Sequence, residues 1–518
     1  MIRTTRFTGM AAALLAATSL SHAHEHSSDP APEKLGSVAF ETSCSKQVAA
    51  DFNRGVALIH SFWHDEAHRS FDKVAAADPE CAMAYWGQAM ASFHLYSSTP
   101  SENDLKDGRA ALAHAATARK KTPREAAYLR AVETLYDGFN PSDYVGAATR
   151  FANAMGDVAQ KYPHDLEATT FYALALLASE KPGDTSLTNA RKAVALLNPL
   201  LKQHPDHPGL AHYVIHACDN PQMSEAGVAA ARTYAQIAPA APHALHMPSH
   251  IFARRGLWED DIRSNLASKA AADQPNIGGE NKLHAMEFLE YAYLQTGQFD
   301  KARAIADEAK TVKAEEVHYN DYYLTVEARF PSLLAIESQD WTTALNLQPI
   351  PGAHWYSHAT TLLANAMAAG HLRDVDAGAK AAKTFDTLTE KFPERLKAGT
   401  SAAHLRDEIH AWAFVARGDT KNAIDLLRPI ADRQEIVGKG EVELPAREML
   451  AEMLLTEAKS REALDEYQRS LKSDPNRRNG LIGAAKAAER VGETKLAAEY
   501  YKKVNASSPS DSTPRLTE

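Results

Sequence analysis

Apolar residues recur along most of the chain at the three- and four-residue intervals of amphipathic α-helices. From Val48 onward, alanine-rich stretches alternate with short breaks of Gly, Asp, Asn and Pro, and the stretch 67–77, for example, stops at Asp78 and Pro79. Alternating runs of β-branched residues, which would predict strands, are missing from the sequence. The pattern therefore predicts an all-α protein built from many antiparallel helices.

Small and aromatic residues also repeat along the chain at a fixed distance. Ala463 and Tyr467 recur 34 residues later as Ala497 and Tyr501. A small residue, an aromatic residue and a proline share the same offsets near both ends of the chain, at Ala67, Phe71 and Pro79 and at Ala463, Tyr467 and Pro475. This pattern resembles the tetratricopeptide repeat (TPR) family. The resemblance implies an α-solenoid of stacked antiparallel helix pairs, wound as a right-handed superhelix, whose concave face usually binds peptides or partner proteins.

Three segments extend this resemblance to a narrower group. Residues 62–67 (FWHDEA), 81–87 (CAMAYWG) and 243–250 (HALHMPSH) are similar to segments of exported bacterial TPR proteins whose biochemical role is undefined. The resemblance implies a fold and a binding face, but it implies no reaction.

The first residues have the features of an export signal. Arg3 and Arg6 precede a short apolar run over 10–20, and Ser21 and Ala23 are small residues at the places that define a cleavage site. The sequence therefore predicts a signal peptide over 1–23 and a periplasmic protein, and the alternative is an ordinary first helix. No later stretch reaches the ~18 uninterrupted apolar residues of a membrane-spanning helix, so we expect no membrane span.

The rest of the chain is expected to fall into five parts. They are a flexible leader over 24–36, N-terminal TPR-like repeats over 37–200, central histidine-rich repeats over 201–330, C-terminal repeats over 331–505 and a flexible tail over 506–518. The leader is polar and interrupted by proline, which favours disorder.

Charge and cysteine content narrow the possible partners and the compartment. The chain has 66 acidic and 56 basic residues, a formal net charge of −10, and so it lacks the basic surface that binding to DNA or RNA requires. Of the three cysteines, Cys44 and Cys81 would form a disulfide in an oxidising compartment, and three free thiols are the alternative. Cys218 is then left as a buried thiol or a spare metal ligand.

Many of the 23 histidines gather in the central third of the chain. His212 and His216 recur 34 residues later as His246 and His250, so two neighbouring repeats carry matching pairs of histidines four residues apart. Such a pair lies ~5–6 Å apart on one helix face, and the axes of packed helices are ~8–10 Å apart. The sequence therefore predicts that these four imidazoles converge on one Zn or Cu ion.

Other polar residues accompany these pairs. His243 and, in the next repeat, His284 hold corresponding places, and Glu287 would serve as an oxygen ligand or accept an imidazole N–H. Arg254 would help to hold a carboxylate. Two alternatives to a metal site stay open. One is a polar groove that binds a ligand or peptide through His243, His284, Glu287 and Arg254, and the other is a structural hydrogen-bonding role.

These patterns favour an interaction protein over an enzyme: an exported α-solenoid that binds a partner protein or peptide and holds a divalent metal ion. One alternative is a metal-dependent hydrolase in which the four histidines bind the metal and Glu287 is the base. Another is a soluble periplasmic metal carrier, in which Cys218 or Met247 completes a softer ligand set. The number of protein ligands distinguishes an enzyme from a structural or storage site, because closed four-ligand sites are structural and three-ligand sites with an open position are catalytic.

Overall fold

The computed structural model describes residues 33–181, 184–273, 278–313, 320–353, 355–391, 400–440 and 443–507. The predicted signal peptide and most of the predicted leader and tail lie outside these residues. Within them the chain forms helices and no β-strand, which confirms the all-α prediction. In the same residues, no helix is both long enough and apolar enough to cross a membrane.

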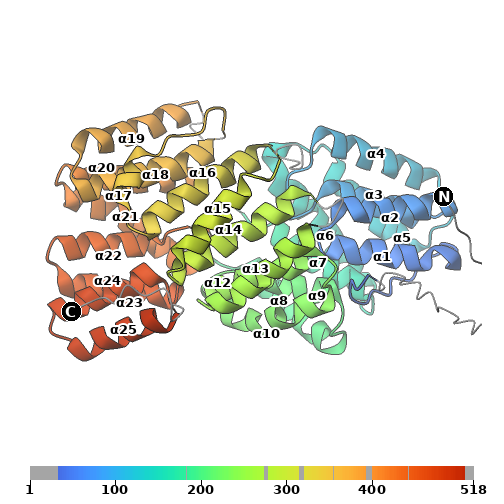
Figure 1. Ribbon diagram of the computed structural model, residues 1–518. Helices are drawn as coiled ribbons and strands as arrows, with labels where there is room; N and C mark the ends of the chain where they lie inside the picture. The colour runs from blue at the N-terminus through green and yellow to red at the C-terminus, as the bar shows by residue number, and fades with distance from the viewer. Residues whose placement is uncertain are drawn as a thin grey trace, which may run out of the picture. The chain divides into compact units, whose positions relative to one another are not determined.

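The helices follow one another with short connections (Figure 1). The N-terminal part holds η1 (Lys46–Val48), α1 (Ala49–His60), α2 (His64–Ala77), α3 (Ala82–Phe93), α4 (Glu102–Thr117), α5 (Pro123–Tyr136), η2 (Pro141–Asp143), α6 (Tyr144–Lys161), α7 (Leu166–Ala178) and α8 (Thr188–Gln203). The central part holds α9 (Pro208–Cys218), α10 (Ser224–Ile237), α11 (Pro242–His246), α12 (Pro248–Arg254), α13 (Trp258–Ala272), α14 (Gly279–Gln295), α15 (Phe299–Ala309) and α16 (Asn320–Glu337). The C-terminal part holds α17 (Trp341–Asn346), α18 (Trp355–Leu372), α19 (Val375–Thr389), α20 (Ser401–Ala416), α21 (Thr420–Val437), α22 (Ala446–Thr456), α23 (Ser460–Ser473), α24 (Arg478–Arg490) and α25 (Thr494–Ser507).

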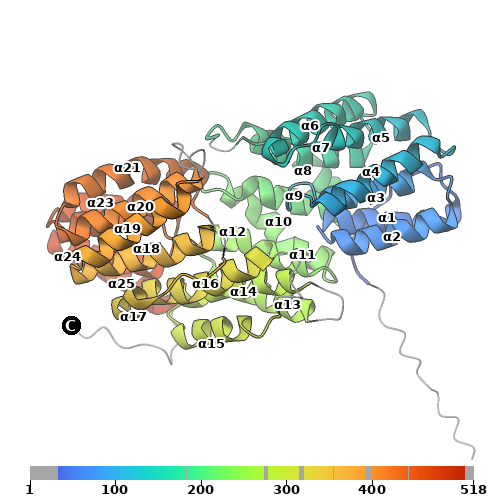
Figure 2. The ribbon, with the colours of Figure 1, turned by 90° about the horizontal axis from the view of Figure 1, so that it is seen from above.

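Each α-helix packs against the helices that precede and follow it, from α1 against α2 through α24 against α25 (Figure 2). Most other packed pairs are separated by only one or two helices in the chain, as in α7 against α9 and α18 against α20. Packing between near neighbours is the property that defines a solenoid. The architecture is therefore the α-solenoid that the repeat pattern predicts.

The repeated aromatic residue fills the space between successive helix pairs. Phe71 of α2 is completely buried, and a Cβ atom built on Gly55 of α1 would lie 2.7 Å from its ring. A Cβ atom on Gly87 of α3 would overlap the same ring. Tyr467, at the equivalent repeat position in α23, is packed in the same way against Gly483 of α24. The small and aromatic positions of the repeat thus act together, because the glycines leave the room that the rings occupy.

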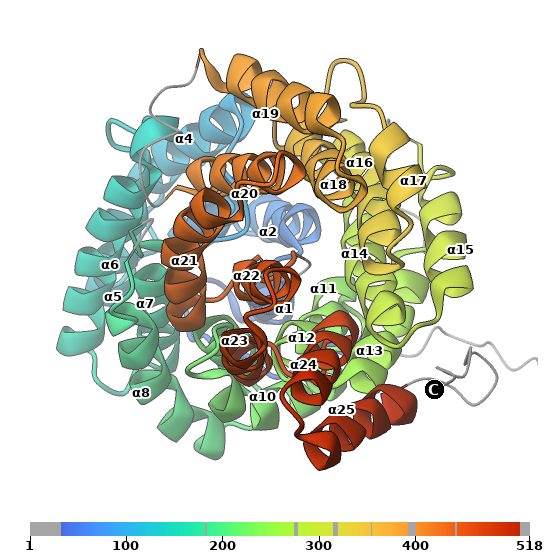
Figure 3. The same cartoon turned by 90° about the vertical axis from the view of Figure 1, so that its left-hand side faces the viewer.

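A disulfide and a group of side-chain hydrogen bonds join segments that are distant in the sequence. Cys44 and Cys81 form a disulfide across a sequence separation of 37, as predicted, while Cys218 is a free, buried thiol. The Trp258 indole of α13 donates a hydrogen bond of 2.9 Å to the carbonyl oxygen of Asn476, just before α24. Figure 3 shows the ribbons of α13 and α24 near each other. The fully buried Arg477 guanidinium, also just before α24, donates a hydrogen bond of 2.7 Å to Glu337 at the end of α16. These contacts join the last repeats to the central ones.

Candidate metal centre

The predicted site residues lie on four helices of the central part. His212 and His216 are on α9, and His284 is on α14. His246 and His250, expected on one helix, are instead divided between α11 and α12, which meet at Met247 and Pro248. A proline inside a helix lacks the N–H of the next helical hydrogen bond and clashes with the preceding turn, so the helix ends and restarts there.

Six histidines form two sites of three. Site A consists of His212, His216 and His243, and site B consists of His246, His250 and His284. Within each site the potential ligand nitrogens all lie within 4.8 Å of one another. In site A the Nε2 atom of His212 is 3.0 Å from that of His216 and 3.2 Å from that of His243. In site B the Nε2 atoms of His246 and His250 are 3.0 Å apart.

These separations match the ligand spacing of a metal ion. Two nitrogens bound tetrahedrally to Zn at ~2.0–2.1 Å are about 3.3 Å apart. The structure divides the four predicted ligands between the two sites, and each site gains a third imidazole from a residue expected to line a groove. His212, His246 and His250 are buried, whereas the third ligands and His216 are half-buried, so both sites reach towards solvent.

The outer nitrogens of site B are held by hydrogen-bond acceptors. The Nδ1 atom of His246 lies 2.7 Å from the Oδ1 atom of Asn265, whose amide nitrogen donates to Asp261. The Nδ1 atom of His250 lies 2.9 Å from a carboxylate oxygen of Asp219. Because both partners are acceptors, each Nδ1 carries the hydrogen, and the Nε2 atoms of the two rings face each other at the centre of the site.

The central imidazole of site A, that of His212, is also oriented by a hydrogen-bond acceptor. The Nδ1 atom of His212 lies 2.6 Å from the backbone carbonyl oxygen of His60, so its Nε2 atom presents a lone pair. Burial, reinforced by the neighbouring imidazoles, lowers the pKa values of His212, His243 and His246 well below their ordinary value. These rings are therefore neutral at neutral pH, which is the form that binds a metal ion.

The nearby carboxylates act as supports for the imidazoles. Asp219 also accepts a hydrogen bond of 2.8 Å from the Nε atom of Arg254, so that arginine binds this aspartate. Glu287 accepts hydrogen bonds from the Nδ1 atom of His284 at 3.3 Å and from Arg329 at 2.7 Å. Although burial alone would raise the pKa of Glu287, Arg329 and His284 hold it below its ordinary value. Such outer partners fix the orientation of metal-binding histidines.

Aromatic rings border both sites. Phe62 stacks on His216 and His243, with ring centroids 5.5 and 5.4 Å apart, and Phe288 lies 4.8 Å from His246. Phe62 and Tyr96 have positive φ angles of 53° and 75°, which are uncommon for bulky residues and cluster at functional sites. Sequence reasoning found Phe62 only as part of a similar segment. It missed Tyr96 and the acceptors described above, because no repeat spacing marks them.

A third group of metal-ligand types lies behind site A. In the buried triad of His60, Glu167 and His207, the two carboxylate oxygens accept hydrogen bonds of 2.8 and 2.9 Å from the two imidazoles. Burial alone would raise the pKa of Glu167, but the two histidines hold it well below its ordinary value. The triad is therefore satisfied as a hydrogen-bonded unit, and it fixes the segment whose carbonyl orients His212.

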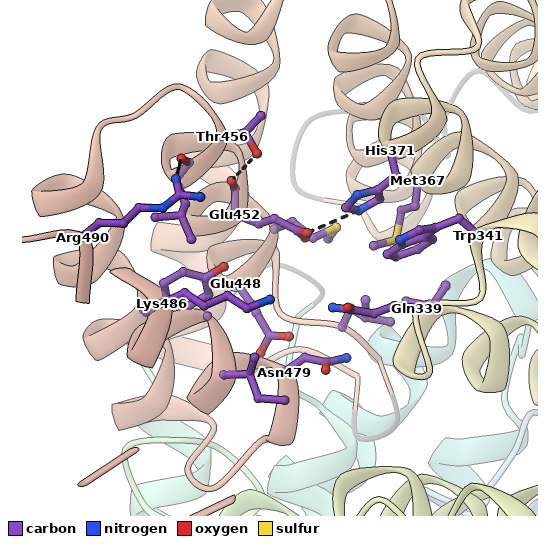
Figure 4. A pocket seen from close by; sticks show the side chains of 17 residues that line it. Gln339, Trp341, Met367, His371, Glu448, Glu452, Thr456, Asn479, Lys486 and Arg490 are labelled. Atoms are coloured by element: carbon purple, nitrogen blue, oxygen red, sulfur yellow. Dashed lines mark hydrogen bonds and ion pairs between the residues drawn. The ribbon is translucent and has the colours of Figure 1, made fainter. Parts of the chain in front are cut away.

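A separate polar pocket of about 230 Å³ lies among α16–α18 and α22–α24 (Figure 4). Figure 4 shows His371 facing Glu452, with 3.3 Å between Nε2 and Oε1, and the His371 ring stacks on Trp341 at 3.8 Å. Burial raises the pKa of Glu452 to about 7 and lowers that of His371 to about 4. None of the lining residues belongs to site A or B, and sequence reasoning missed this pocket because its residues are scattered over several repeats.

Comparisons with known proteins bear on the fold alone. No protein-family model matches the chain, and no curated protein matches it. Among solved structures, the TPR domain of P58(IPK) is 12% identical, covering 87% of this chain and 99% of that domain, with a TM-score of 0.22. The human IFIT1 dimer with m7Gppp-AAAA is also 12% identical, covering 82% of this chain and 90% of that one, with a TM-score of 0.37. A signal-transduction ATPase with a TPR sensor from Pyrococcus horikoshii is 13% identical, covering 85% and 65%, with a TM-score of 0.32. All three TM-scores are below 0.5.

Proposed function

We propose that this protein is an exported TPR-like protein that binds transition-metal ions at sites A and B. The observation that carries the proposal is the convergence of three imidazoles in each site, where all the potential ligand nitrogens lie within 4.8 Å of one another. In site B the Nε2 atoms of His246 and His250 are 3.0 Å apart, close to the spacing of two nitrogens bound to one metal ion. The other nitrogens of the two rings are already engaged by acceptors on other segments.

The donor atoms define the class of metal. Imidazole nitrogens suit Zn and Cu, whereas Mg and Ca require oxygen ligands. Each site offers three imidazoles, so an ion bound there keeps at least one coordination position for a further ligand. This count favours a reactive or exchanging centre over a closed structural one.

The alternatives gain less support from the geometry. A hydrolase with Glu287 as base is disfavoured, because that carboxylate is bound by Arg329 and its pKa is lowered. A carrier that uses Cys218 is disfavoured, because this thiol joins neither site and burial raises its pKa to about 12. Helical-repeat surfaces commonly bind other proteins, so a protein or peptide partner stays part of the proposal.

Metal binding to tag-free, full-length protein tests the proposal. We expect wild type to bind two Zn or Cu ions, and we expect His212→Ala/His216→Ala and His246→Ala/His250→Ala to lose one ion each. The matched control is His164→Ala/His204→Ala, which removes two exposed histidines and should retain both ions. Circular dichroism verifies that every variant is folded. Equal binding in wild type and both site variants, or no binding to wild type, would contradict the proposal.

A further inference from the structure

Sites A and B adjoin each other. The ring of His216 in site A lies 6.2 Å, centroid to centroid, from that of His250 in site B. The ring of His243 in site A lies 6.0 Å from that of His246 in site B. Each site therefore touches the other through two pairs of rings, and ions held in the two sites would be neighbours.

The charge around the two sites favours ions of low charge. All six ligands are imidazoles, which bind a metal ion in their uncharged form, and the two supporting carboxylates, Asp219 and Glu287, are each bound to an arginine. Two divalent ions would therefore add four positive charges to a largely buried cluster, whereas two monovalent ions would add two. Because the desolvation cost rises with the square of the charge, a monovalent ion costs about a quarter as much as a divalent one.

Copper is the metal that fits this restriction. Among the metals that imidazole binds well, zinc has no redox chemistry, stays divalent and would add a water to three imidazoles to become four-coordinate, whereas copper has a monovalent state that accepts three ligands. The aromatic border adds a second restriction. Phe62 covers His216 and His243 of site A, and Phe288 lies against His246 and His250 of site B at 4.8 and 4.7 Å. An apolar border of this kind favours a small neutral ligand over a charged one.

We infer that sites A and B form one dinuclear copper centre that binds dioxygen between its two ions. The inference rests on the proposed function. In the reduced centre each ion is copper(I). When dioxygen reacts, each ion gives up one electron and becomes copper(II), and dioxygen accepts the two electrons to become peroxide. Two water molecules then release the peroxide as hydrogen peroxide and leave two hydroxides on the oxidised ions, so the electrons, atoms and charges balance.

Anaerobic loading followed by oxidation tests the inference. Full-length protein is loaded with copper(I) without oxygen, freed of excess copper, counted for bound copper and exposed to dioxygen. We expect two copper ions per chain and a copper(II) electron paramagnetic resonance signal well below two spins, because neighbouring copper(II) ions couple through a shared oxygen ligand. The His246→Ala/His250→Ala variant should bind one copper ion and give a signal of about one spin. The His164→Ala/His204→Ala control should match wild type.

A milder variant covers the case in which the double variant does not fold. Asp219→Asn leaves all six imidazoles in place and weakens the support of His250 together with the ion pair to Arg254, so copper should bind ~10–100-fold more weakly at site B. Two coppers that together give two full spins, or copper(I) that fails to bind at both sites, would overturn the inference and leave zinc or copper(II) binding intact. If no metal binds to wild type, the proposed function fails as well.

Discussion

One methyl group added at Gly55 tests how the repeats pack. The completely buried Phe71 ring lies between Gly55 and Gly87, and a Cβ atom at Gly55 would be 2.7 Å from Cζ of the ring. Carbon atoms in contact prefer ~3.5–4.0 Å, so the ring would have to retreat by about 0.8 Å. The backbone of Gly87 blocks that movement, because a Cβ atom there would already overlap the ring.

We expect Gly55→Ala to lower the stability of the protein, whereas a glycine-to-alanine substitution on an exposed helix usually raises it. Alanine is favoured over glycine by ~1 kcal/mol in a helix interior, whereas overpacking costs ~1–3 kcal/mol. We therefore expect Gly55→Ala to lower the free energy of unfolding by up to about 2 kcal/mol. In a Phe71→Ala background the ring is absent, and the same substitution should raise the free energy of unfolding by up to ~1 kcal/mol.

Guanidinium unfolding followed by helical circular dichroism measures this difference. The four proteins are wild type, the two single variants and the double variant, and Phe71→Leu replaces Phe71→Ala if the latter does not fold. The reasoning is refuted if Gly55→Ala shifts the unfolding midpoint by the same amount and in the same direction in both backgrounds. Equal shifts would mean that the glycine and the ring do not compete for one space.

Two further predictions concern covalent and titratable groups. Removal of the disulfide by Cys44→Ser/Cys81→Ser should lower the free energy of unfolding by about 4 kcal/mol in the chain-entropy model, and three alkylatable thiols in unreduced wild type would contradict the bond. The raised pKa of Glu452, about 7, means that its stabilising contribution is complete below pH ~4.5 and is lost as the pH rises through about 7. We therefore expect the difference in thermal midpoint, Glu452→Gln minus wild type, to be larger at pH 8 than at pH 4. A difference independent of pH would count against the raised pKa of Glu452.

Local sequence patterns are enough to establish the helices and their repetition. Helical periodicity is a local property, because each amphipathic stretch must bury one face whatever lies beyond it. The 34-residue recurrence of Ala463 and Tyr467 likewise reflects packing between neighbours, and Tyr467 does fill the space left by Gly483. The same recurrence placed His212 and His216 at positions equivalent to His246 and His250. The helical architecture therefore follows from the order of residues alone.

The grouping of the histidines depends on tertiary structure. Repeat spacing predicts equivalent positions, but it does not predict that the helix is interrupted at Pro248. Nor does it predict that His243 and His284 become the third members of two separate sites. The acceptors Asp219 and Asn265 come from the end of one helix and the middle of another, and no spacing links them to the rings they hold. Ligand geometry depends on the relative rotation of packed helices and on hydrogen bonds between distant segments, whereas periodicity records only which face of each helix is buried.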